Sequence, residues 1–145
     1  MSSIFSPLIK APPKSNVLIA TWNVAEHFSM REVVVPLSRS KVGLLVGYSK
    51  KTHDLRELIG ILKFYKYDLG WDVRMVPNLH IKAWIINETA YVGSCNFVPN
   101  EPIINEMWKV PFSKVFPVVS HYFKGAAQLS HSTVLQLVHP VDRHA

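Results

Sequence analysis

Short apolar runs alternate with helix-like segments through the first half of the chain. Residues 17–21 (VLIAT) and 41–48 (KVGLLVGY) are rich in β-branched and aliphatic side chains, which is typical of buried strands. Apolar residues spaced by three and four predict helices over 25–37 and 52–69. Strands that alternate with helices predict an α/β sandwich with a mixed sheet.

The second half of the chain is predicted to continue this pattern. Strands are expected over 71–76, 79–86, 90–97 and 105–110, and helical spacing extends over 112–138, divided at Pro117 and Gly125. Residues 1–15 contain two adjacent prolines and are expected to form an extended N-terminal arm. A chain of 145 residues suits one domain, so residues 16–145 are interpreted as a single domain.

Composition restricts the partners and the cellular setting. The single cysteine, Cys95, cannot form an intramolecular disulfide or a cysteine-rich zinc site, which favours a reducing, cytoplasmic location. No apolar run reaches the ~18 residues of a membrane span, and the first residues lack the layout of a signal peptide. The net charge of +6 predicts a polyanionic partner, either nucleic acid or anionic lipid.

Polar side chains gather in the two strands expected over 79–86 and 90–97. If Asn87, Glu88 and Thr89 form the loop between them, residues whose numbers sum to 176 face each other. That register pairs Lys82 with Ser94 and His80 with Asn96 on one face, with Gly93 beside them to let a phosphate approach closely. An imidazole, an ammonium, a hydroxyl and an amide together indicate a site rather than a core layer.

The spacing His80-x-Lys82, Asn87, then Gly93-Ser94-x-Asn96-Phe97 resembles the HxKxxxxD and GSxN motif of the phospholipase D superfamily. The resemblance covers roughly residues 16–138 and implies that family's fold, a mixed sheet sandwiched between helices. Two departures stand out: Asn87 occupies the aspartate position, and the spacer to Gly93 is one residue short. Glu88 would replace the aspartate if the turn shifted by one residue.

The resemblance also implies roles for the site residues. His80 would be the nucleophile that forms a phosphohistidine intermediate, and Lys82 and Asn96 would hold the phosphoryl oxygens, with Ser94 donating to the same oxygens. Glu106 would orient Ser94 or a histidine, although Glu101 competes for that role. No cofactor or metal is implied, because the four aspartates are dispersed along the chain.

The chain carries one copy of the motif, whereas an in-line displacement needs a second imidazole opposite the first. The resemblance to the small single-motif endonucleases of the superfamily therefore implies a homodimer with a composite active site. The leading interpretation is a metal-independent endonuclease acting on DNA or RNA. A phospholipase or phosphatidyltransferase, and a non-catalytic nucleic-acid-binding relative, remain as alternatives.

A basic segment lies where the helix over 52–69 begins. Lys50, Lys51 and Arg56 are candidate substrate-binding residues, because cationic side chains and helix-terminal amides both bind phosphate. The alternative is an ordinary solvated helix end. The other histidines show no metal-ligand spacing, and Cys95 alternates away from Ser94, which favours a buried position.

Overall fold

The structure is a computed structural model that describes residues 3–99 and 105–130, and in this part of the chain seven strands form one sheet. The strands are β1 (Asn16–Thr21), β2 (Lys41–Tyr48), β3 (Asp72–Pro77), β4 (Ala83–Ile86), β5 (Thr89–Gly93), β6 (Met107–Val110) and β7 (Ala127–Gln128). The helices are α1 (Ser6–Ile9), α2 (Arg31–Leu37), α3 (Leu55–Lys63) and α4 (Phe112–Gly125), with short 3-10 or π turns η1 (Ser3–Phe5), η2 (His27–Met30) and η3 (Phe64–Asp68). The predicted mixed α/β class is confirmed.

The sheet is mixed and has the strand order β6-β5-β4-β1-β2-β3-β7. The neighbouring strands β1, β2 and β3 run parallel, connected through α2 and α3, whereas β4, β5, β6 and β7 each pair antiparallel with a neighbour. The carboxyl ends of the parallel strands therefore meet at one edge of the sheet, and β4 begins at that same edge because it runs the opposite way.

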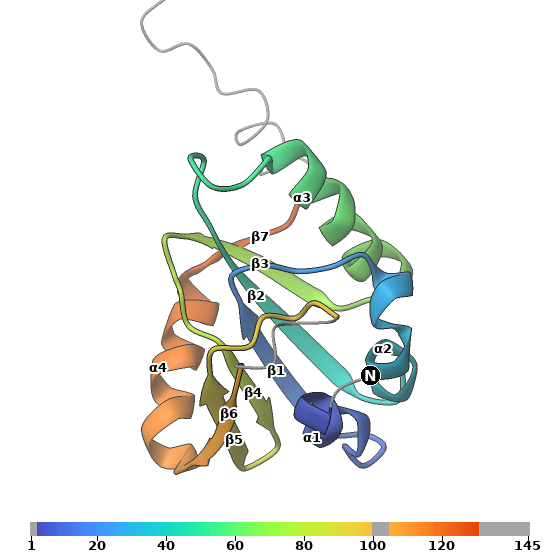
Figure 1. Cartoon of the computed structure of the whole chain (residues 1–145), viewed down its shortest axis with the longest axis vertical. Helices are drawn as coiled ribbons and strands as arrows, with labels where there is room; N and C mark the ends of the chain where they lie inside the picture. Colours follow the sequence, from blue (N-terminus) through green and yellow to red (C-terminus); the bar gives the residue numbers. More distant parts are fainter. Residues whose placement is uncertain (1–2, 100–104, 131–145) are drawn as a thin grey trace, which may run out of the picture.

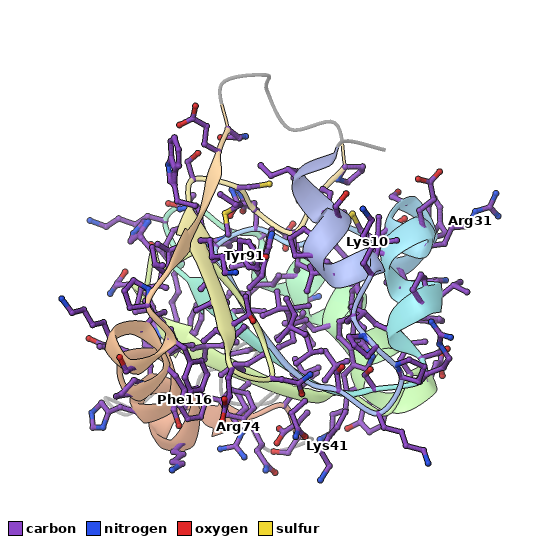
Figure 2. The ribbon with its side chains drawn as sticks, turned by 90° about the horizontal axis from the view of Figure 1, so that it is seen from below. Lys10, Arg31, Lys41, Arg74, Tyr91 and Phe116 are labelled. Atoms are coloured by element: carbon purple, nitrogen blue, oxygen red, sulfur yellow. The ribbon has the colours of Figure 1, made fainter. Side chains whose placement is uncertain are left out.

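Helices cover both faces of the sheet (Figure 1). One core cluster packs α1, α2 and α3 against alternate residues of the strands, for example Ile19, Leu44 and Val73. A second cluster packs α4 against the residues of the opposite parity, such as Ala20 and Leu45. Figure 2 shows the same division from below, with Phe116 of α4 on one side of the sheet and Arg31, at the start of α2, on the other.

The N-terminal segment differs from the extended arm that its prolines predict. Residues 3–9 form η1 and α1, and the side chains of Phe5 and Leu8 are buried in the core. Phe5 lies 5.6 Å from Trp84, centroid to centroid. Burial of two large apolar side chains explains why this segment packs on the sheet instead of projecting from it.

The register of the β4–β5 hairpin is one residue away from the predicted one. Ile86 pairs with Thr89 and Ala83 with Val92, because the turn contains only Asn87 and Glu88. Asn87 adopts the left-handed backbone conformation with φ of 51°, which asparagine tolerates in tight turns. A shift of one residue changes which side chains share a face, so Lys82 lies opposite Gly93 rather than Ser94.

Candidate functional site

The candidate site lies at the edge where the parallel strands β1, β2 and β3 end. The loops that leave these strands carry Trp22, His53 and His80, respectively. In open α/β sheets, ligands bind at the carboxyl ends of the strands, because the loops there are free to carry functional side chains. His80 and Lys82, predicted to lie within a strand, instead lie in the loop between β3 and β4.

His80 is exposed to solvent but its imidazole is held in place. Its ring stacks on the indole of Trp22 with 3.8 Å between ring centroids and an angle of 19° between the planes. Trp22 is itself buried, with 8% of its surface exposed, so it offers a rigid platform. The stack leaves the imidazole at the surface while restricting its rotamers.

A second histidine, His53, contacts the same indole. Its ring lies edge-on to Trp22 with 4.7 Å between centroids. Its Nδ1 accepts a hydrogen bond from the Ser49 amide at 3.0 Å, and its Nε2 lies 3.0 Å from the Trp22 carbonyl and 3.1 Å from Asn23 Oδ1. This pattern fits the tautomer with hydrogen on Nε2. His53 therefore ties the loop after β2 to the loop after β1.

The loop that bears His80 passes closely over the end of β2. A Cβ placed on Gly47 would lie 1.7 Å from the carbonyl oxygen of Leu79, so only glycine allows this crossing. The turn begins at Asn78, whose φ is 60° and whose amide donates to the Tyr48 carbonyl at 2.7 Å. These two contacts hold the backbone of Asn78 and Leu79, the two residues immediately before His80.

Lys82 lies two residues beyond His80. Its Nζ donates to the carbonyl oxygen of His80 at 3.1 Å. The ammonium therefore lies beside the backbone of the histidine, where it can offset negative charge on a bound phosphoryl group.

Asn96 supports the loop that carries Trp22. Its Oδ1 accepts hydrogen bonds from the amides of Trp22 at 3.1 Å and Asn23 at 3.0 Å. This oxygen therefore holds the loop whose Trp22 ring stacks against His80.

Ser94 and Gly93 meet the backbone of Glu106. The Ser94 amide donates to the Glu106 carbonyl at 2.9 Å, and the Ser94 hydroxyl accepts from the Glu106 amide at 3.1 Å. A Cβ on Gly93 would lie 1.8 Å from the Glu106 carbonyl oxygen. The space beside Gly93, expected to admit a phosphate, is filled by the chain that enters β6. The carboxylate of Glu106 is exposed, and within residues 3–99 and 105–130 it forms no hydrogen bond with Ser94 or a histidine; Glu101 lies outside the described residues.

Asn87 lies at the opposite end of β4 from His80. Its Oδ1 accepts from the Asn16 amide at 2.9 Å, and its Nδ2 donates to the Ser15 hydroxyl at 3.1 Å. Asn87 thus closes the hairpin turn onto the start of β1. Neither Asn87 nor its neighbour Glu88 is placed to support His80 directly.

The basic segment lies beside the site, but the helix end is already capped. Lys50, Lys51 and Arg56 are exposed. The carboxylate of Asp54 accepts hydrogen bonds from the amides of Arg56 and Glu57 at the start of α3. An internal carboxylate thus already satisfies the amides of Arg56 and Glu57.

In residues 3–99 and 105–130, no three His, Cys, Asp or Glu side chains come together as a metal-binding group. Among the helices of that same part, none has the length and apolar character needed to cross a bilayer.

Comparison with known proteins shows similarity in fold. No family model matches the sequence, and no curated protein matches it. TrmBL2, an archaeal chromatin protein described as having a novel mode of DNA binding, superposes with a TM-score of 0.57 at 12% identity, over 86% of this chain and 48% of that chain. Polyphosphate kinase from Porphyromonas gingivalis superposes with a TM-score of 0.52 at 16% identity, over 88% of this chain and 24% of that chain.

Both likenesses are likenesses of fold. This chain spans about half the length of TrmBL2 and about a quarter of the kinase. Similarity at these identities concerns the fold, and the activity has to be argued from the site.

Proposed function

We propose that this protein is a phosphodiesterase acting on nucleic acid, an endonuclease that hydrolyses DNA or RNA without a metal. The observation that carries the proposal is the exposed imidazole of His80, stacked on Trp22 beside the ammonium of Lys82. A nucleophile must be both accessible and oriented, and the stack supplies both properties.

The chemistry proceeds in two displacements at phosphorus. One nitrogen of His80 attacks the phosphodiester, the P–O bond to the leaving strand breaks, and a second imidazole gives that oxygen a proton. Water then gives a proton to the second imidazole and attacks the phosphohistidine, the P–N bond breaks, and His80 is restored. Lys82 offsets the charge on the non-bridging oxygens in both steps.

The second imidazole is proposed to come from His80 of another copy of the chain. His53 contacts the same indole as His80, but both of its ring nitrogens are engaged by the loops that it joins. A two-fold homodimer would place one His80 on each side of a shared phosphate. The cytoplasm is the expected location.

A second candidate function is nucleic-acid binding without turnover. It is favoured by the engagement of Asn96 Oδ1 and the Ser94 hydroxyl in contacts within the protein, and by the remote position of Asn87. In this alternative His80 and Lys82 bind phosphate but do not react with it.

The test is incubation of the purified protein with labelled single- and double-stranded DNA, RNA and phospholipid vesicles in excess EDTA. We expect nucleic-acid cleavage, reduced roughly 10²- to 10⁴-fold in His80→Ala and in Lys82→Ala, because both side chains act on the transition state. His121→Ala and Lys114→Ala on α4 are matched controls that should cleave like wild type.

Four results would contradict the proposal. Full activity of folded His80→Ala would eliminate His80 as the nucleophile. Activity that EDTA abolishes and magnesium restores would replace the mechanism with a metal-dependent one. Binding of nucleic acid without any cleavage would favour the second candidate, and hydrolysis of vesicles alone would indicate a phospholipase.

A further inference from the structure

A hollow opens on the surface where β2 and β3 end. Its volume is about 480 Å³. We call it the Tyr48 groove, and its lining residues are Tyr48, Ser49, Lys50, Lys51, Pro77 and Asn78. It thus lies between the end of β2 and the end of β3, at the same edge of the sheet as the candidate site.

The groove and the candidate site share their backbone supports. Asn78 lines the groove and is two residues from His80, so their Cα atoms are at most roughly 7 Å apart. On the other wall, Ser49 donates to His53, which contacts the indole on which His80 stacks. A polymer bound in the groove would therefore need to extend by only about one of its own units to reach His80.

The lining of the groove combines positive charge with an aromatic ring. Lys50 and Lys51 are exposed, and the lining includes no carboxylate. The nearby Asp54 carboxylate is engaged by the amides of α3. Burial raises the pKa of the Tyr48 phenol, so Tyr48 stays uncharged at physiological pH and adds no repulsion toward an anion.

This combination points to one class of substrate. Proteins bind single-stranded nucleic acid with a cationic groove that follows the phosphates and with aromatic rings on which bases stack. In a duplex the bases are stacked on one another and are not available to a ring at the surface. A purely electrostatic site for duplex backbone would need the lysines but not the tyrosine.

Building on the proposed function, we infer that the substrate is single-stranded nucleic acid and that the Tyr48 groove holds the nucleotide next to the phosphate at His80. Tyr48 stacks on the base of that nucleotide, and Lys50 and Lys51 contact its flanking phosphates.

The inference is tested by binding, in a His80→Ala background with EDTA so that nothing is cleaved. Fluorescence anisotropy measures the affinity for a fluorescein-labelled 12-mer of thymidine and for a 12-base-pair duplex. Tyr48→Leu keeps an apolar side chain against the core but removes the ring, and it should weaken single-strand binding about 5- to 150-fold, the equivalent of one stacked base. Duplex binding should change less than about twofold, and Tyr48→Phe should bind like the parent.

The lysines have a separate readout. Lys50→Ala and Lys51→Ala should each reduce the slope of log affinity against log salt by about 0.7 for the single strand. Tyr122→Leu and Lys114→Ala, which change exposed residues of α4, are the matched controls and should alter neither affinity nor slope.

Equal losses for the two oligonucleotides, or no loss for Tyr48→Leu, would overturn the inference. If the Tyr48→Leu protein fails to fold, the parent's affinities for the single strand and for the duplex are compared instead. The inference requires that the parent bind the single strand more tightly. Selective single-strand binding by a wild type that never cleaves would reject the proposed function while leaving the groove assignment in place.

Discussion

At the scale of single residues, the motif divides into side chains that face solvent and side chains that hold the backbone. His80 is exposed, and the Nζ of Lys82 lies beside its carbonyl. Asn96, Ser94 and Asn87 form hydrogen bonds to the backbone or side chains of neighbouring segments. A short motif can therefore combine two accessible side chains with contacts that hold the surrounding backbone in place.

Asn96 offers a direct test of this division. Asn96→Ala removes the acceptor for two backbone amides, at Trp22 and Asn23, and should lower the free energy of unfolding by about 1–3 kcal/mol. Urea denaturation measures the loss. Asn96→Asp keeps an acceptor oxygen and should retain most of the stability, and Asn16→Ala, at an exposed residue at the start of β1, serves as the control. An unfolding energy of Asn96→Ala equal to that of wild type would refute the supporting role.

At the scale of elements, local sequence patterns predicted the strands and helices well. They predicted the contacts between these elements poorly. The strand over 41–48 matches β2 residue for residue, because its apolar run is bounded by polar residues at both ends. The helix expected over 52–69 starts at Leu55, where Asp54 provides the cap, and ends as the π turn η3. Both deviations lie at helix ends, where the spacing of apolar residues carries little information.

The register of the hairpin and the platform under His80 could not be predicted in the same way. The register depended on the backbone of Asn87, which allows a two-residue turn that no pattern of apolar residues shows. Trp22 and His53 come from loops distant in sequence from His80, so only the fold brings them together. Sequence spacing predicted candidate residues of the site, but it did not predict the residues that hold them in place.

The crossing of the His80 loop over β2 leads to a prediction for a pair of glycines. Gly47→Ala places a methyl group against the Leu79 carbonyl, so it should displace the loop, destabilise the fold and reduce cleavage. Gly60→Ala changes a glycine in α3 that has open space around it and should raise stability by up to about 1 kcal/mol. Thermal unfolding and the cleavage assay compare the two variants. Cleavage by Gly47→Ala at the wild-type rate would show that the crossing does not position His80.

At the scale of the whole molecule, the net charge of +6 favours a polyanionic partner. A homodimer would double that charge and strengthen the attraction for a polyanion. The reason for expecting the dimer, however, is chemical, because one imidazole cannot both attack phosphorus and protonate the oxygen that leaves from the opposite side.

The homodimer is therefore predicted to be the active unit, with one composite site built from two copies of His80. Heterodimers of wild type and His80→Ala, purified through two different affinity tags, should have well under half of the wild-type activity, because the shared site keeps one imidazole and loses either the nucleophile or the acid. Two independent sites would retain about half, since one subunit would be unchanged. Sedimentation of the wild type as a monomer at catalytic concentrations, or half activity in the heterodimer, would reject the composite site. The acid that protonates the leaving oxygen would then have to come from the same chain as the nucleophile.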